Sequence, residues 1–74
     1  MSGTATIYVS LLDEGVEVRR PVQADLISGD VFRIVDQPYD RDVERWEFEP
    51  GDHVICTPVD TVQGPVLAAV RLAV

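Results

Sequence analysis

The chain has 74 residues, of which thirteen are acidic and six are basic, so its formal net charge is −7. At this length there is room for one domain with a small core, because only about 60% of the extended chain's surface is buried on folding. The acidic balance repels phosphate and argues against nucleic-acid binding, and no apolar run of about 18 residues predicts a membrane-spanning helix.

The sequence also shows no sign of export. The first residues, Met-Ser-Gly-Thr, contain neither a basic region nor an apolar run, so no signal peptide is predicted. Cys56 is the only cysteine, which excludes a disulfide within the chain and suits a reducing compartment. We therefore expect a cytoplasmic location.

The first predicted element is a strand over residues 5–12, in which apolar and polar side chains alternate. Ile7, Val9 and Leu11 fall on one face, which is the period-two pattern of a half-buried strand. A turn is predicted at residues 13–15, where Asp-Glu-Gly interrupts the alternation.

A second strand is predicted over residues 16–26. Arg20 interrupts its apolar face directly before Pro21, and proline cannot donate a hydrogen bond to a neighbouring strand. We therefore expect Arg20 to lie on a sheet edge or at a β-bulge. The other members of the apolar face are Val16, Val18, Val22, Ala24 and Leu26.

Residues 28–30 are typical of a hairpin turn, and they precede a short predicted strand over residues 31–35. Phe32 and Ile34 lie on one face of this strand. The other face holds Val31, Arg33 and Val35.

Residues 36–45 show no sustained period and predict the longest loop, with one helical turn around residues 41–45. The loop is rich in carboxylates, and calcium binds clustered oxygen ligands. The calcium-loop template, however, requires glycine at its sixth position, which is Arg45 when Asp40 is the first. We therefore interpret the segment as a solvated loop with arginines between the acids. The four carboxylates are those of Asp36, Asp40, Asp42 and Glu44.

The last third of the chain predicts two further strands. Residues 46–49 alternate again, residues 50–51 form a tight Pro-Gly turn, and residues 53–57 form a strand. Two prolines and a glycine break the pattern over residues 58–65, and a final strand covers residues 66–74. Because both faces of this final strand are apolar, we expect it to be central or covered. One face holds Val66, Ala68, Val70, Leu72 and Val74, and the other holds Leu67, Ala69, Arg71 and Ala73.

Five or six short strands separated by turns indicate an all-β fold, and in 74 residues this means a small five- to six-stranded barrel. Closure of the sheet also removes exposed strand edges. No repeat or linker divides the sequence, so residues 1–74 are expected to form a single domain.

Three segments carry a resemblance to a known group. Leu-Leu-Asp-Glu-Gly at residues 11–15, Arg-Pro-Val at residues 20–22 and Trp-Glu-Phe-Glu-Pro-Gly at residues 46–51 resemble a family of small uncharacterised bacterial proteins. The resemblance covers roughly residues 7–56. It implies an SH3-like barrel and a bacterial source, and it implies no particular activity.

The only histidine and the only cysteine, His53 and Cys56, do not form a catalytic pair in the expected strand. They are three residues apart, which places their side chains on opposite faces. We expect Cys56 to be a small buried apolar residue and His53 to be partly exposed. Because zinc requires about three or four convergent nitrogen or sulfur ligands, no metal site is predicted.

Five side chains are candidates for binding a partner. Trp46 and Phe48, two residues apart, are expected to form one wall of the core, whereas Tyr8 lies in the polar phase of its strand and is expected to be exposed. An SH3-type groove binds polyproline ligands with exposed aromatics beside an acidic loop, but the Ala-Leu-Tyr-Asp-Tyr segment of that family is absent. The five candidates are Tyr8, Arg19, Arg20, Tyr39 and Trp46.

Arg19 and Arg20 suit a carboxylate or an acidic patch on a partner. The interpretation that we favour is an internal pair with Glu17 or Asp25. Charge alone does not distinguish these two roles.

The predicted function is that of a non-enzymatic protein-interaction module, which binds a protein partner or a second copy of itself. A marginal core and a nearly uncharged final strand favour this interpretation. The alternative is a small-ligand-binding or catalytic unit, whose site lies at a subunit interface or under the loop of residues 36–45, because side chains fill so small a barrel. No cofactor, nucleic acid or membrane is expected as a partner.

Overall fold

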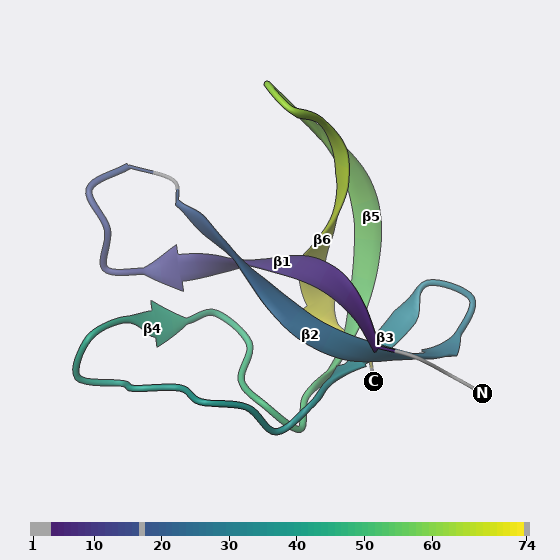
Figure 1. Cartoon of the computed structure of the whole chain (residues 1–74), viewed down its shortest axis with the longest axis horizontal. Helices are drawn as coiled ribbons and strands as arrows, with labels where there is room; N and C mark the ends of the chain where they lie inside the picture. The colour runs from purple at the N-terminus through teal and green to yellow at the C-terminus, as the bar shows by residue number, and fades with distance from the viewer. Residues whose placement is uncertain (1–3, 17, 74) are drawn as a thin grey trace.

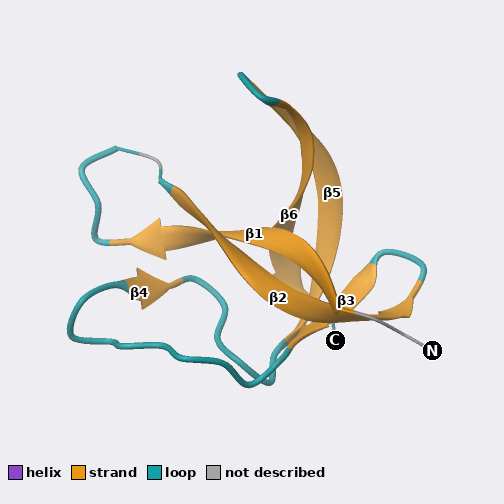
Figure 2. Cartoon of the chain, in the orientation of Figure 1, coloured by secondary structure: helices purple, strands orange, loops and turns teal. Residues whose placement is uncertain are grey.

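The structure is a computed structural model that describes residues 4–16 and 18–73. All regular structure within these residues is β-strand (Figure 2), so the predicted all-β fold of five to six strands is confirmed. The six strands are β1 (Thr4–Leu12), β2 (Arg19–Ser28), β3 (Val31–Ile34), β4 (Arg45–Trp46), β5 (His53–Thr61) and β6 (Gly64–Leu72).

Five of the strands form a closed ring. The hydrogen-bonded order is β2-β3-β5-β6-β1-β4, and β1 also pairs with β2, which returns the sheet to its first strand (Figure 1). The neighbours within the ring are antiparallel except β1 and β6, which run parallel and meet at Tyr8 and Ala68. The short β4 lies outside the ring and pairs with the end of β1.

The interior of the ring is an apolar core that includes no buried polar or charged side chain among the described residues. Ile7 and Val9 of β1 are fully buried, as are the alternating residues of the strands around them. Trp46 and Phe48 pack against the same cluster, which confirms that they form part of the core. Burial of each large apolar side chain contributes about 1.5–3 kcal/mol. The remaining core members are Val22, Ala24, Phe32, Ile34, Val54, Cys56 and Ala69.

The predicted turns are confirmed at two glycines. Gly29, in the turn between β2 and β3, has a φ of 53°, and Gly51, after Pro50, has a φ of 95°. Backbones at these angles favour glycine because a Cβ atom would be strained there. The Pro-Gly turn also brings the Gly51 N–H to the carbonyl oxygen of Ile34, at 2.7 Å.

The prediction for the second strand is wrong at both of its ends. Pairing with β1 starts at Arg19, so Val16 lies in the connection between the strands and is 75% exposed. Leu26, at the far end of β2, is also exposed. Arg20 lies on an edge, as expected, because β1 alone pairs with it and pairing with β3 begins only at Ala24.

The predicted break over residues 58–65 is also wrong. β5 continues to Thr61 and β6 starts at Gly64, so only Val62 and Gln63 separate the two strands. The prolines are accommodated because this outer half of the hairpin has no third strand beside it: β3 pairs with β5 only as far as Ile55. A proline on a free edge removes no ladder hydrogen bond.

A bulge changes which residues of β6 face inward. Ile55 pairs with Arg71 but Cys56 pairs with Ala69, so Val70 is an extra residue on β6. As a result Ala68 and Ala69 are both buried, whereas Val70 is 48% exposed. The prediction that Val66, Ala68, Val70, Leu72 and Val74 share one face is therefore wrong beyond the bulge, where Leu72 is also exposed. Val74 lies outside the described residues.

Residues 36–45 form the long irregular segment that the sequence predicts. Its single turn covers residues 41–43, within the expected range, and the N–H groups of Val43 and Glu44 both donate to the carbonyl oxygen of Asp40. The following strand, β4, consists of Arg45 and Trp46, so only Trp46 of the predicted alternating residues 46–49 is in a strand.

Candidate interaction surfaces

Two aromatic rings organise the segment of residues 36–52. The rings of Tyr39 and Trp46 are stacked, with centroids 4.3 Å apart and planes at 20°. The Trp46 backbone N–H donates to the Tyr39 hydroxyl at 2.8 Å, and the indole Nε1–H donates to Glu44 Oε1 at 2.9 Å. The pair closes the irregular segment against the core, where Trp46 is only 3% exposed.

An arginine flanks each of the stacked rings. Arg41 Cζ lies 4.8 Å from the Tyr39 ring centroid, and Arg20 Cζ lies 6.0 Å from that of Trp46. Both distances are within the range of cation–π attraction. Each guanidinium is also paired with a carboxylate: Arg41 Nε with Glu49 at 2.8 Å, and Arg20 Nε with Glu44 at 3.1 Å.

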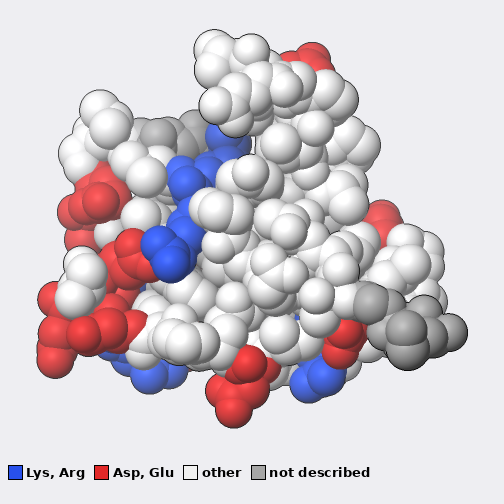
Figure 3. Space-filling model, in the orientation of Figure 1, with Lys and Arg blue, Asp and Glu red and all other residues white. Residues whose placement is uncertain are grey.

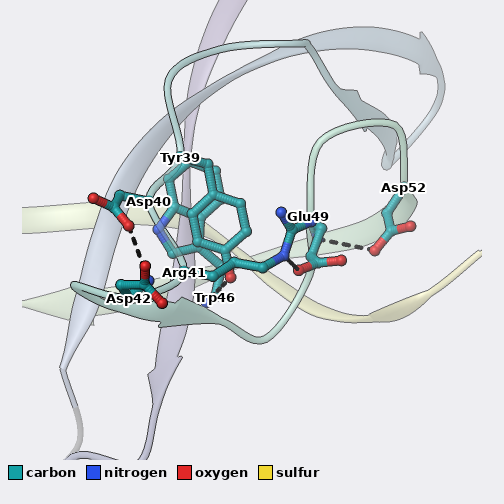
Figure 4. A network of polar contacts seen from close by, with 7 residues as sticks. All are labelled: Tyr39, Asp40, Arg41, Asp42, Trp46, Glu49 and Asp52. Atoms are coloured by element: carbon teal, nitrogen blue, oxygen red, sulfur yellow. Dashed lines mark hydrogen bonds and ion pairs between the residues drawn. The ribbon is translucent and has the colours of Figure 1, made fainter.

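Further hydrogen bonds fix the loop around this stack, as Figure 4 shows. The Asp40 carboxylate accepts from the Asp42 N–H at 2.9 Å, and the Asp52 carboxylate accepts from the Glu49 N–H at 2.9 Å. Carboxylates that accept backbone N–H groups in this way replace the missing ladder partners of an irregular chain.

The ion pair between Arg41 and Glu49, beside Tyr39, shifts the pKa of both groups. The hydrogen bond from Arg41 lowers the pKa of Glu49, with smaller contributions from the charge of Arg41 and from the Tyr39 hydroxyl. The same bond raises the pKa of Arg41. Both groups are solvent-exposed, so this pair orients the loop and adds little to stability.

A groove opens beside this segment, under the loop of residues 36–45. Its volume is about 350 Å³. We call it the loop groove. It is lined by Arg20, Pro38, Tyr39, Asp40, Val43 and Glu44.

A second groove, of about 220 Å³, lies between the outer end of the β5–β6 hairpin and the β1–β2 ribbon. Figure 1 shows this hairpin projecting from the body of the molecule. At its tip Val62 is fully exposed. We call this the hairpin groove. It is lined by Tyr8, Arg19, Thr61, Val62, Gln63 and Val66.

The five predicted binding residues are divided between these two surfaces. Tyr8 and Arg19 line the hairpin groove, and Tyr8 is half-buried there rather than freely exposed. Arg20 and Tyr39 line the loop groove, with Trp46 buried behind Tyr39.

The predicted pair of Arg20 with Asp25 is wrong. Among the described residues, the carboxylate partner of Arg20 is Glu44, which lies 24 positions further along the chain. Asp25 instead pairs with Arg33 at 3.2 Å. Glu17 lies outside the described residues.

Sequence reasoning missed the hairpin side of the second groove. Thr61, Val62, Gln63 and Val66 fall in or next to the segment that two prolines appeared to break. The available signal was Gly64 between two runs with β-branched residues, since a short connection that contains glycine is consistent with a hairpin. Gly64 has a φ of 111°, as such a turn requires.

The His53 and Cys56 side chains lie apart, as predicted. Cys56 is buried and His53 is exposed. Burial raises the pKa of the Cys56 thiol to about 11, and the nearby charge of Asp30 acts in the same direction. A protonated, buried thiol is a poor nucleophile. Residues 4–16 and 18–73 contain no group of three or more His, Cys, Asp or Glu side chains that could hold a metal ion.

The chain matches no protein-family model, no curated protein and no solved structure with which it was compared. Within the described part of the chain, no helix is long and apolar enough to cross a membrane.

Proposed function

We propose that this protein is a non-enzymatic interaction module that binds another protein chain through the hairpin groove. The observation that carries the proposal is the exposure of Val62 at the tip of a projecting hairpin, directly beside the groove. A fully exposed β-branched residue gains more from contact with a partner than from water.

The face of the hairpin that lines the groove is uncharged. The pairs Thr61↔Gly64 and Val59↔Val66 place these side chains on one face, because side chains alternate along a strand. Between these two pairs lies Asp60↔Pro65, so the Asp60 side chain points to the opposite face of the hairpin. Across the groove, Tyr8 contributes an aromatic wall with a polar hydroxyl. Surfaces of this composition are typical of protein interfaces.

The hairpin is suited to contact through side chains and not through strand addition. Because proline has no N–H, Pro58 and Pro65 occupy positions where the backbone nitrogen points away from the partner strand. The Cys56 N–H, two residues before Pro58, also points away from β6, because it donates to the carbonyl oxygen of Asp30 at 2.9 Å. Each free edge of the hairpin therefore lacks one of its outward-pointing N–H donors, which disfavours pairing with a new strand.

A capture experiment with matched variants tests the proposal. The tagged full-length chain is exposed to an extract of its native cells that also contains untagged copies, and retained proteins are identified by mass spectrometry. Val62→Asp places a charge in the groove, whereas Val16→Asp adds the same charge at an exposed valine that lines neither groove. We expect a retained protein, either a different chain or an untagged copy, that is lost with Val62→Asp and kept with Val16→Asp. Equal retention by both variants, or no retention at all, would overturn the proposal.

A second candidate function is small-ligand binding in the loop groove, whose volume falls within the range of small-molecule sites. Trp46 is the only tryptophan, and it lies behind Tyr39, so its emission reports on this groove. We expect a saturable emission change on titration with a panel of small amines and carboxylates, and its loss in Val43→Asp. No saturable change across the panel would reject this function.

We also propose that the five-stranded ring is an SH3-like barrel and that the protein acts in the bacterial cytoplasm. The resemblance of residues 7–56 and the closed ring support the first part. The lone buried thiol supports the second. Fractionation of the native cells tests the location, and recovery of the chain outside the cytoplasmic fraction would contradict it.

A further inference from the structure

We infer that the occupant of the hairpin groove is the hairpin of a second copy of this chain, so that two molecules dock hairpin to hairpin about a twofold axis. This inference rests on the proposed function of the groove as a protein-binding site. Three properties of the hairpin favour a second copy over other partners. These are its low charge, its projection from the ring, and the prolines Pro58 and Pro65 on its free edges.

The first property is charge. Residues 1–52 contain twelve of the thirteen acids and five of the six arginines, and so hold the whole net charge of −7. Residues 53–74 contain only Asp60 and Arg71 and are neutral. In the view of Figure 3 the projecting hairpin is almost free of charged side chains, while acidic groups gather on other parts of the molecule. Two copies of so acidic a chain repel one another least where this neutral segment meets itself.

The second property is shape. The chain exposes 5045 Å², whereas about 4,500 Å² is expected for a compact monomer of this size. The excess of about 500 Å² approaches the roughly 600–800 Å² that each partner contributes to a small specific interface. The radius of gyration, 11.9 Å, likewise exceeds the about 11.3 Å expected for 74 residues. The hairpin is one of two parts that extend from the five-stranded ring, the other being the segment of residues 36–52 (Figure 1).

The hairpin and its groove are also complementary to each other. Val62 projects at the tip, and the groove lies beside it, between Val66 and Tyr8. A twofold axis therefore places each Val62 in the groove of the other copy, so that one surface patch supplies both halves of the interface.

The blocked edges determine how far the association proceeds. Pro58 and Pro65 disfavour the addition of further strands to the hairpin. A twofold contact uses the patch on both molecules and leaves none open. The expected assembly is thus a closed dimer and not a filament.

Sedimentation velocity of the purified full-length chain tests this inference. We expect the wild type to change from monomer to dimer between about 10 µM and about 500 µM, which corresponds to a modest interface. Val62→Asp is expected to weaken the dimer at least about tenfold, because it replaces an apolar contact by a carboxylate that must lose its hydration on docking. Val16→Asp, which adds the same charge at an exposed valine outside both grooves, is expected to leave the dimer unchanged. Raising the salt from about 0.05 M to about 0.3 M should strengthen dimerisation, since it screens repulsion between the acidic bodies.

A wild type that stays monomeric over this range overturns the inference. So does equal weakening by the two aspartate variants, or growth of the assembly beyond a dimer. Circular dichroism melting of each variant identifies a loss of folding. The capture experiment separates this inference from the proposed function: a different protein that is retained in a Val62-dependent manner by a monomeric chain supports the module and rejects the dimer.

Discussion

The segment of residues 36–52 and the outer half of the β5–β6 hairpin both extend from the five-stranded ring, but different forces hold them. The segment of residues 36–52 is irregular and charged, and its fold depends on two stacked rings and their polar partners. The outer half of the hairpin is regular and contains one charged residue, Asp60. Its backbone ladder holds it, while Val62 at its tip remains exposed.

This difference indicates what each region contributes. In the irregular segment, Trp46 belongs to the core and every polar contact around it fixes its position. In the hairpin, Val62 contacts little of its own chain and is available to another. Substitutions in the first region should therefore change stability, and substitutions in the second should change association.

The largest expected effect is that of Trp46→Ala. Removal of a buried tryptophan costs about 3–5 kcal/mol, which is a large part of the roughly 4–11 kcal/mol expected for a domain of this size. Urea unfolding followed by circular dichroism measures the loss. Val43→Ala, in the same segment but 76% exposed, should change stability by less than about 0.5 kcal/mol. Equal losses for the two variants would show that Trp46 does not support the core.

Tyr39→Phe should have an intermediate effect. It keeps the stacked ring but removes the hydroxyl that accepts the Trp46 N–H, and a buried donor left without a partner costs about 1–3 kcal/mol. The matched control is Tyr8→Phe, whose hydroxyl forms no hydrogen bond with the described residues. Urea unfolding of both variants distinguishes them, and a Tyr8→Phe loss as large as that of Tyr39→Phe would contradict this role.

The Cys56 thiol provides a pH-dependent probe of the core. Its pKa rises from 9.0 to about 11 on folding, so the folded state keeps the proton longer than the unfolded state. The associated stability is present below pH 9 and is lost as the pH rises towards 11. We expect slow reaction with a disulfide reagent at pH 8 in the native state and fast reaction in urea. Equally fast reaction in both states would be inconsistent with a buried thiol.

A smaller effect on the pH dependence of stability is expected for substitution of Glu49. Because Arg41 lowers its pKa in the folded state, the carboxylate stabilises the fold above its unfolded pKa, and this contribution disappears as the pH falls through the folded value. Glu49→Gln should therefore flatten the acid limb of the stability profile slightly. The measurement is the melting temperature between pH 7 and pH 2, and a steeper acid limb in the variant would reverse the assignment.

The smallest effect on stability is expected for Val62→Asp. The side chain is fully exposed at the hairpin tip, so its replacement should change the free energy of unfolding of the monomer by less than about 0.5 kcal/mol. Dilute samples, in which any dimer has dissociated, are required for this measurement. A loss comparable to that of Tyr39→Phe would place Val62 among the residues that support the fold.

The sequence was sufficient to predict which residues are buried where burial depends on the local alternation of apolar and polar side chains. Ile7 and Val9 lie in the core because they share one face of β1. Trp46 and Phe48 also lie in the core, although only Trp46 is in a strand. The glycine turns were also predictable, since Gly29 and the residue after Pro50 adopt angles that favour glycine.

Features that depend on which strands become neighbours were not predictable. The bulge at Val70 follows from the register between β5 and β6, and the partner of Arg20 follows from the position of a distant loop. Pro58 and Pro65 suggested a break because the sequence does not show whether a strand has a free edge. For this reason the hairpin side of the groove was missed, although Tyr8 and Arg19 on its other wall were identified.

Hydrogen–deuterium exchange at two protein concentrations tests the central claim most directly, because it observes both regions in one sample. If the hairpin is the docking surface, amide exchange over residues 57–67 slows at high protein concentration. Exchange over residues 36–48, in the irregular segment, stays the same. Slowing that is confined to residues 36–48, or no dependence on concentration in either region, would contradict the assignment of the hairpin as the docking surface.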